Sequence, residues 1–165
     1  MSDAPVSPLA HQARTSLPSG KLTLANSPWK AEVELQIQFY DLDPMEIVWH
    51  GRYVEYLETA RCALLDKLGY NYPAMKDSGY AWPVIDLHLR YAAPATFGQR
   101  IKVAAAVVEW ENRLKIDYQV SDAVTGARLT RAATVQVAVQ ISNREMCFVS
   151  PPVLWHKLGL IPPAP

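Results

Sequence analysis

One helical pattern, set among extended stretches, most constrains what this chain can fold into. From about residue 51, apolar side chains recur at the spacing of a helix with one buried face: Tyr53, Leu57, Ala60, Leu64 and Leu68. Gly69 follows them, and glycine is the residue that most often ends a helix. No other stretch of the sequence has a helical pattern of this length. A lone helix with one apolar face needs a sheet to bury it.

Extended stretches supply that sheet. Residues 31–39 alternate apolar and polar side chains, which is the period of a strand with one buried face. Four further stretches after the helix have strand character: 81–91, 100–110, 113–121 and 127–141. Short, turn-forming segments separate the last three, which predicts antiparallel neighbours. We therefore expect an α+β fold in which an antiparallel sheet of about five strands buries the apolar face of one long helix.

Length and composition favour a single domain with two peripheral segments. A chain of 165 residues can form one core. Residues 1–28 are rich in Pro, Ser and Ala and are expected to form a disordered leader. The domain is expected over 29–145. Residues 146–165 then form a tail, in which a proline-initiated short helix is expected.

Charge, cysteines and hydropathy narrow the function classes. Lys plus Arg and Asp plus Glu each number 16, so no net positive field favours nucleic acid. Cys62 and Cys147 show no metal-binding or CxxC spacing. The N-terminus has no signal-peptide pattern, and no apolar run reaches the roughly 18 residues of a membrane span. We expect a soluble cytoplasmic protein without metal, cofactor, nucleic acid or membrane partner.

The densest chemistry lies between the first strand and the helix, where residues 39–53 read FYDLDPMEIVWHGRY. Two aspartates, a glutamate and a histidine fall within this run. The Asp43-Pro44 pair favours a turn, so residues 41–49 are expected to form a loop rather than continue the strand. The helix that follows contains Glu58-Thr59-Ala60-Arg61.

This motif, with the order of strands and helix, resembles the hotdog-fold acyl-thioesterases of the 4-hydroxybenzoyl-CoA thioesterase type. The resemblance implies a hotdog fold, in which an antiparallel sheet of about five strands wraps around one long central helix. Their pattern is roughly an aromatic residue, Asp-x-Asp-Pro-x-Gly, a short apolar run ending in His or Tyr, x-Asn-Tyr, and then Glu-x-Ala-Arg. The resemblance covers about residues 31–142. It implies hydrolysis of an acyl-CoA or acyl-carrier-protein thioester without a cofactor. It also implies a homodimer with its sheets joined edge to edge, often doubled to a tetramer.

The same resemblance assigns the catalytic roles. Asp43 corresponds to the catalytic carboxylate, and His50 stands where a backbone N–H at the helix start polarises the thioester carbonyl. Helix N-termini offer unpaired N–H groups and a positive dipole end, which suit a developing oxyanion. The carboxylate can act as a nucleophile or as a base that activates water, and the sequence leaves both routes open. Participation of the His50 imidazole is likewise open.

Other residues near the helix start and on the strands are candidates for substrate binding. Trp49, Gly51 and Tyr53 border the helix start, although Tyr53 also lies on the apolar face of the helix. Arg90 is a candidate for the CoA phosphates, as Arg100 is, but arginines at strand ends are ordinarily solvated.

Five residues have mainly structural interpretations. Asp41 is expected to be a turn or capping residue. Glu58 and Arg61 are expected to form a helix pair near the subunit contact. Trp82 and Tyr91 line either the acyl pocket or the core.

Two residues depart from the family pattern at the junction of loop and helix. Glu46 replaces a glycine, and Arg52 replaces an asparagine. A positive φ at Glu46 would cost about 1–2 kcal/mol. Our hypothesis is that Glu46 and Arg52 form an ion pair that compensates for both changes. The competing hypothesis is that Glu46 reaches the pocket and modulates substrate preference or weakens hydrolysis.

Three other interpretations compete with hydrolysis. A non-catalytic hotdog module that binds acyl chains or a carrier protein is the alternative that the two departures favour. A dehydratase or hydratase is disfavoured, because its sites typically have Pro-Gly after the histidine whereas His50 precedes Gly51-Arg52. A metal site of Asp41, Asp43 and His50 is disfavoured because a loop with three candidate ligands is a weak pattern. The sequence leaves the acyl group unidentified.

Overall fold

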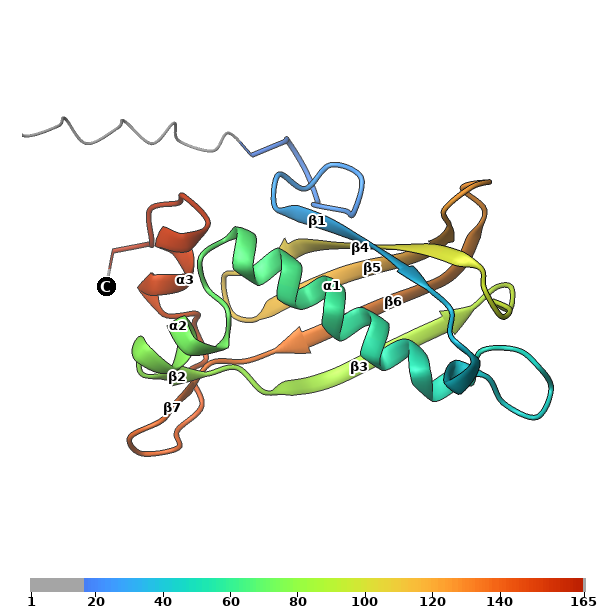
Figure 1. Cartoon of the computed structure of the whole chain (residues 1–165). Helices are drawn as coiled ribbons and strands as arrows, with labels where there is room; N and C mark the ends of the chain where they lie inside the picture. Colours follow the sequence, from blue (N-terminus) through green and yellow to red (C-terminus); the bar gives the residue numbers. More distant parts are fainter. Residues whose placement is uncertain (1–16, 165) are drawn as a thin grey trace, which may run out of the picture.

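The sheet and the helix expected from the sequence form the two layers of the molecule (Figure 1). The computed structural model describes residues 17–164. The main sheet has five antiparallel strands in the order β1-β4-β5-β6-β3. These are β1 (Lys30–Gln36), β3 (Val84–Tyr91), β4 (Arg100–Glu109), β5 (Leu114–Asp122) and β6 (Arg128–Gln136). The other elements are η1 (Phe39–Asp41), η2 (His50–Arg52), α1 (Tyr53–Lys67), α2 (Tyr72–Asp77), β2 (Tyr80–Ala81), β7 (Val139–Gln140) and α3 (Pro152–Lys157). The expected α+β class is confirmed.

Helix α1 is buried along the face that its periodicity predicts. Tyr53, Leu57, Ala60 and Leu64 are each at most 2 % exposed. Helix α1 ends at Lys67, and Gly69, two residues later, has a left-handed φ of 66°. The amides of Gly69 and Tyr70 donate to the carbonyls of Asp66 and Leu65, which caps the last turn. None of the helices within residues 17–164 is long and apolar enough to cross a membrane.

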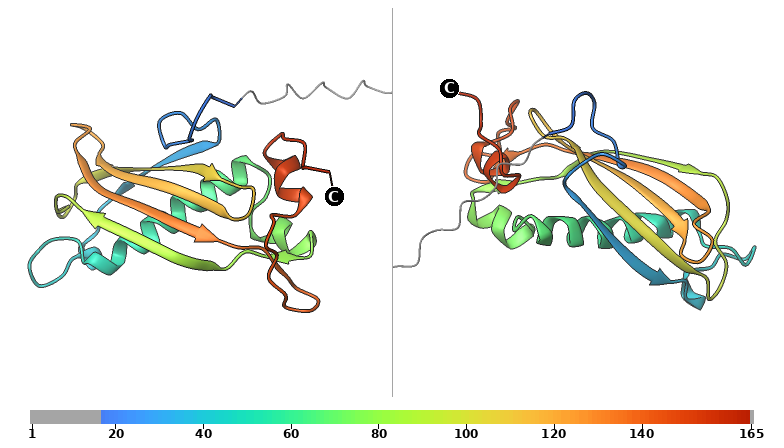
Figure 2. Two further views of the ribbon diagram at one scale, coloured as in Figure 1. Left: turned by 180° about the vertical axis from the view of Figure 1, so that it is seen from behind. Right: turned by 90° about the horizontal axis from the view of Figure 1, so that it is seen from above.

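The sheet presents one apolar face to α1 and one polar face to solvent. On β4, Val103 and Ala105 lie opposite Val120 and Tyr118 of β5, and all four side chains are buried. The two further views show that α1 lies against one face of the sheet (Figure 2). The opposite face carries the intervening polar residues, because successive side chains of a strand point to opposite faces.

Two of the expected strands are interrupted. The stretch 81–91 divides into β2 and β3 at Trp82-Pro83, and the stretch 127–141 divides into β6 and β7 at Val137-Ala138. Pro83 has no N–H to donate to a ladder, so a continuous strand is disfavoured there. The amide of the Gln136 side chain instead donates to the Trp82 carbonyl oxygen at 2.6 Å. Strands β2 and β7 pair with each other in a separate two-stranded sheet.

The segment before β1 packs onto the domain, although we expected a disordered leader up to residue 28. Leu22 is 5 % exposed and Ser27 is 2 % exposed. The Ser27 hydroxyl donates to the carbonyl oxygen of Val107 on β4 at 2.6 Å. The expected boundary at residue 28 therefore does not coincide with the edge of the packed structure. Residues 1–16 of that leader lie outside the described residues.

The C-terminal segment packs at the end of the sheet where the segment before β1 also packs. It contains the expected short helix, α3, whose residue Leu154 is fully buried together with Leu158. The indole N–H of Trp29 donates to the Leu158 carbonyl oxygen at 3.0 Å. Trp110 stands edge-on to both Trp29 and Trp155, with ring centroids 5.1 and 6.1 Å apart. The tail is thus part of the folded unit rather than an appendage.

Candidate active site

Asp43 lies on a tight hairpin between η1 and η2. Leu42 and Val48 form an isolated bridge. The Asp43 amide donates to the Ile47 carbonyl oxygen, and the Glu46 amide donates to the Asp43 carbonyl oxygen, both at 2.9 Å. Glu46 has φ of 63°, the left-handed conformation that closes hairpin loops of this length. The Asp-Pro pair thus forms the turn that the sequence predicted.

The carboxylate of Asp43 is held on one side and open on the other. Its Oδ1 accepts the Met45 amide at 2.8 Å. Its Oδ2 has no hydrogen-bond partner among residues 17–164. The side chain is half-buried and borders a cleft of about 430 Å³. One carboxylate oxygen therefore remains available to a ligand in that cleft.

Three segments enclose the cleft: the hairpin, the start of the helix, and the residues that follow β3. His50 lines it together with Asp43, so the structure brings the two expected catalytic residues to one site. The other lining residues are mostly apolar: Met45, Ile47, Val48, Tyr53, Tyr91, Ala92, Ala93 and Pro94. A small apolar cleft with a single carboxylate suits the acyl end of a ligand better than a charged group.

The start of the helix offers backbone donors. Turn η2 runs directly into α1, so the first amides of this turn have no preceding helical carbonyl. The Arg52 amide donates to the Trp49 carbonyl oxygen at 2.9 Å. The amides of His50 and Gly51 have no acceptor among the described residues. Of the amides of His50, Gly51 and Arg52 at the helix start, the first two are therefore available to a ligand and the third is not.

Gly51 has a packing role that the sequence did not predict. A Cβ atom built at this position would lie 2.4 Å from the ring of Trp49. The indole therefore needs glycine beneath it. Trp49 and Gly51, both expected to bind substrate, pack against each other, and neither lines the cleft.

Two tyrosines form the aromatic wall of the cleft. Tyr53 is 2 % exposed, and its ring stands edge-on to that of Tyr91 at 5.2 Å. The Tyr91 hydroxyl donates to the His50 carbonyl oxygen at 2.6 Å. Burial raises the pKa of the Tyr53 hydroxyl above its ordinary value. Of the two aromatic residues left undecided by the sequence, Tyr91 lines the cleft and Trp82 is part of the core.

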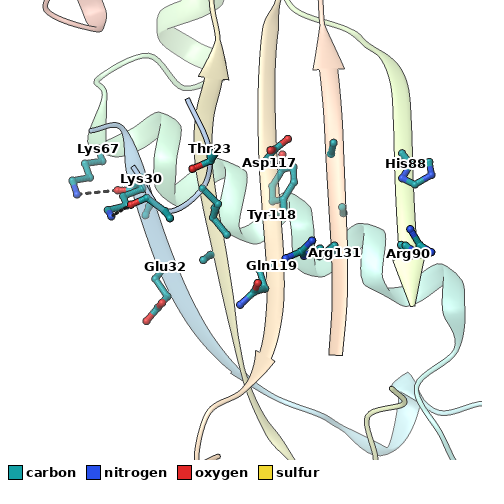
Figure 3. A pocket seen from close by; sticks show the side chains of 16 residues that line it. Thr23, Lys30, Glu32, Lys67, His88, Arg90, Asp117, Tyr118, Gln119 and Arg131 are labelled. Atoms are coloured by element: carbon teal, nitrogen blue, oxygen red, sulfur yellow. Dashed lines mark hydrogen bonds between the residues drawn. The ribbon is translucent and has the colours of Figure 1, made fainter. Parts of the chain in front are cut away.

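Arg90 is not in the cleft. It follows the strand alternation and faces the outer side of the sheet, opposite to Tyr91. There it lines a broad hollow of about 1050 Å³ with His88 and Arg131 (Figure 3). Arg90 of β3 and Arg131 of β6 are direct cross-strand partners. Neither forms an ion pair with another residue of the described chain.

The expected ion pair between Glu46 and Arg52 is not formed, and that hypothesis is wrong. Arg52 instead pairs with Asp41, with Nε 3.1 Å from Oδ1, and with Glu55 at 2.7 Å. The Asp41 side chain is 5 % exposed and accepts the Gln38 amide, as expected of a capping residue. Glu46 is exposed and does not line the cleft.

The expected pair of Glu58 and Arg61 is present on α1. The Tyr72 hydroxyl also donates to Glu58, at 2.7 Å. Arg61 is buried, so this pair is not the solvent-exposed helix pair that spacing alone suggests.

Sequence reasoning missed the segment after β3, where Ala92, Ala93 and Pro94 line the cleft. Small apolar residues carry no chemical signal of their own. The only available signal was the run of small residues before Pro94, which indicates the end of a strand. Their place beside the hairpin comes from tertiary contacts: the Val48 amide donates to the Ala95 carbonyl oxygen at 2.9 Å.

Fold and site together define a hotdog-type domain with a carboxylate beside a helix start, and comparison with known proteins agrees. The model of the thioesterase-like superfamily matches residues 37–163. This match covers most of the chain, which therefore belongs to that superfamily. The expected family, hotdog fold and enzyme class, thioester hydrolase, are thereby confirmed.

Individual relatives share only a modest part of the sequence with this chain. The Bacillus subtilis protein YneP, provisionally named an acyl-CoA thioesterase, is 27% identical over 114 residues, covering 69% of this chain and 76% of its own. A 1,4-dihydroxy-2-naphthoyl-CoA thioesterase from Synechocystis superposes with a TM-score of 0.70 at 22% identity, over 78% of this chain and 94% of its own. A 4-hydroxybenzoyl-CoA thioesterase variant in complex with its substrate gives 0.69 at 17% identity, over 79% and 99%. At these identities the two structures support the fold alone.

The strained backbone at Glu46 leads to a first prediction. Replacing Glu46 with glycine removes the left-handed strain and should raise the free energy of unfolding by up to about 1 kcal/mol. Chemical denaturation measures this change. Glu46→Ala is the matched control, because alanine removes the carboxylate but keeps the strained Cβ. Equal effects of the two substitutions would show that the side chain, and not the backbone, determines stability here.

Proposed function

We propose that this protein hydrolyses acyl-CoA thioesters in the cleft beside Asp43. The observation that carries the proposal is that the open carboxylate oxygen of Asp43 and the unpaired amide of His50 belong to residues of the same small apolar cleft, and that the next amide, of Gly51, is unpaired as well. Acyl-transfer chemistry needs these two features: an oxygen nucleophile or base, and donors for the negative charge on the carbonyl oxygen. Asp43 and the amides of His50 and Gly51 are the residues we assign to these roles.

Either of two routes completes the reaction. In one, Asp43 takes a proton from water, the hydroxide oxygen bonds to the thioester carbon, and the C–S bond breaks to give a carboxylic acid and a thiolate that takes up the proton. In the other, Asp43 itself bonds to the carbonyl carbon and expels the thiolate, and water then cleaves the mixed anhydride. In both, the carbonyl oxygen carries negative charge that the amides stabilise.

The donors in this proposal are backbone groups, with His50 contributing its amide rather than its ring. The imidazole is exposed, and its nearest aromatic neighbour is Trp49, with ring centroids 5.2 Å apart. A backbone amide at a helix start also gains from the helix dipole. The binding-only alternative relied on Glu46 and Arg52 altering the pocket, and neither residue lines the cleft.

Asp43 supplies the decisive test. Asp43→Asn should lower kcat by at least about a hundredfold, because the amide is neither a base nor a nucleophile. Release of free thiol measures turnover on a panel of aliphatic and aryl groups, each presented by CoA and by acyl carrier protein. A cytoplasmic location, compatible with both carriers, stays a prediction.

Asp77→Asn, an exposed change on α2, is the matched control and should leave turnover intact. Circular dichroism would confirm that both variants fold. Wild-type turnover in Asp43→Asn would falsify the assignment. Thermal stabilisation by ligand without thiol release from any wild-type sample would instead support a binding module.

We also propose that the protein forms a homodimer through the free edge of β3, with a tetramer as a further step. Within residues 17–164, β6 is the strand that β3 pairs with, and the other edge of β3 has no strand partner. Three apolar side chains of β3 are at least 40% exposed: Val84, Ile85 and Leu87. An apolar edge strand favours pairing with another chain, and a two-fold axis would let two copies satisfy each other.

This arrangement predicts that one charge on β3 disrupts the dimer. Leu87→Arg should convert the dimer to a monomer, because it would bury an unpaired charge at the interface. Light scattering coupled to gel filtration measures the mass. Val124→Arg, on the exposed turn between β5 and β6, is the control and should keep the wild-type mass. A wild-type monomer, or a dimeric Leu87→Arg protein, would argue against this interface.

Arg90 has a proposed role at the other end of the substrate. Arg90 and Arg131 place two positive charges directly opposite each other on neighbouring strands, which is unfavourable without an anion. We propose that they contact the phosphates of CoA after it has passed over the edge of β3. Guanidinium groups suit phosphate because they donate two parallel hydrogen bonds.

Two substrates, one with the phosphates of CoA and one without, distinguish a phosphate contact of Arg90 from a general loss of enzyme function. Arg90→Gln should raise KM for an acyl-CoA by about threefold to tenfold, as expected for one charged contact at an open site. KM for the same acyl group on N-acetylcysteamine, which lacks phosphate, should stay unchanged. Equal increases for both substrates would contradict the phosphate contact.

A further inference from the structure

Arg52 joins the two segments that flank the Asp43 hairpin. Its Nε lies 3.1 Å from Asp41 Oδ1, and its Nη2 donates to the Tyr40 carbonyl oxygen at 3.0 Å. Its Nη1 donates to both carboxylate oxygens of Glu55 at 2.7 Å. Tyr40 and Asp41 belong to η1, before the hairpin, and Glu55 belongs to the first turn of α1. One guanidinium therefore connects the chain before the hairpin to the helix after it.

Asp41 is the buried end of this connection. Its Oδ2 accepts the Gln38 amide at 2.7 Å, and its carbonyl oxygen accepts the Trp49 amide at 2.9 Å. Asp41 and Trp49 immediately flank residues 42–48, so these contacts close the neck of the hairpin. A carboxylate that is only 5% exposed is costly without a charged partner, and Arg52 is that partner.

The rest of the hairpin is anchored mainly through its second half. The Val48 amide donates to the Ala95 carbonyl oxygen at 2.9 Å, and Ile47 bridges Thr96. In the first half, the hydrogen bonds of Asp43 are to residues of the hairpin itself. The contacts of Asp41 at the neck therefore connect the first half of the hairpin, which carries Asp43, to the rest of the domain.

We propose that Arg52 is a positioning residue: acting through Asp41, it holds the hairpin that carries Asp43 in register with the helix start that carries the His50 amide. Asp43 is two residues beyond Asp41, and His50 is two residues before Arg52. The ion pair therefore closes the loop just outside both groups. The catalytic consequence rests on the proposed function, because misplacement of a reacting group by about 1 Å can cost a hundredfold in rate.

Arginine suits this position better than lysine does. Its acceptors belong to Tyr40, Asp41 and Glu55, so three nitrogens of one planar group are engaged. A lysine offers a single nitrogen and cannot reach three separate acceptors with the same geometry. Arg52→Lys keeps the charge but can retain only part of the bridge.

Hydrogen exchange tests the positioning directly and without substrate. Arg52→Gln should speed exchange of the amides of residues 42–49 by about tenfold or more, because local opening of the neck becomes easier. Exchange in β4 and β5 should not change. Glu55→Gln, which leaves the contact between Arg52 and Asp41 in place, is the matched control and should differ from wild type by less than about twofold. Unchanged exchange of the hairpin in Arg52→Gln would overturn the proposal.

Kinetics test the consequence for catalysis. Arg52→Gln should lower kcat by about tenfold or more while KM stays within about twofold, and Arg52→Lys should recover part of the loss. An unchanged kcat in Arg52→Gln, or an equal loss in Glu55→Gln, would overturn the positioning role. If wild-type protein cleaves no thioester, or Asp43→Asn keeps turnover, the proposed function fails. Hydrogen exchange then still decides whether Arg52 holds the hairpin.

Discussion

The burial of one face of α1 against a single sheet is the constraint on which the rest of this structure depends. The helix packs mainly on β1 and β4, at one side of the sheet. Its first turn consequently lies at the end where β1 leaves the sheet, and the hairpin has only to span from that strand to the helix. The same offset leaves Leu87 of β3 without a helix above it. The position of α1 therefore places the site at this end of the sheet and leaves the Leu87 side chain of β3 exposed.

Local patterns were enough to predict the sheet, the helix and the Asp43 turn, because each depends on periodicity or on residues next to each other in sequence. The interruption at Trp82-Pro83 needed more, because Pro83 only disfavours a continuous strand, and the group that satisfies the Trp82 carbonyl oxygen is the side-chain amide of the distant Gln136. The packing of Leu22 could not be read from a Pro- and Ser-rich segment, because composition does not show which single side chain reaches the core. Long-range contacts decided both cases.

In the candidate site too, local patterns predicted some features and long-range contacts determined others. Asp43 and His50 were identifiable because their motif is contiguous, and both line the cleft. The partner of Arg52 was predicted wrongly: complementary charge alone admits any nearby acid, and backbone geometry selects Asp41 over Glu46. Arg90 and Tyr91 illustrate a limit of another kind. They are adjacent in sequence, yet the strand places them on opposite faces of the sheet.

The hydrogen bond from the Tyr91 hydroxyl to the His50 carbonyl oxygen constrains the peptide group between His50 and Gly51. A trans peptide is planar, with its C=O and the following N–H pointing in opposite directions. By holding the carbonyl of His50, the edge strand therefore also sets the direction of the Gly51 N–H, which belongs to the same plane. Any displacement of β3 rotates that plane. The orientation of a backbone dipole at the helix start is mechanically tied to the outermost strand, and so to whatever molecule pairs with it.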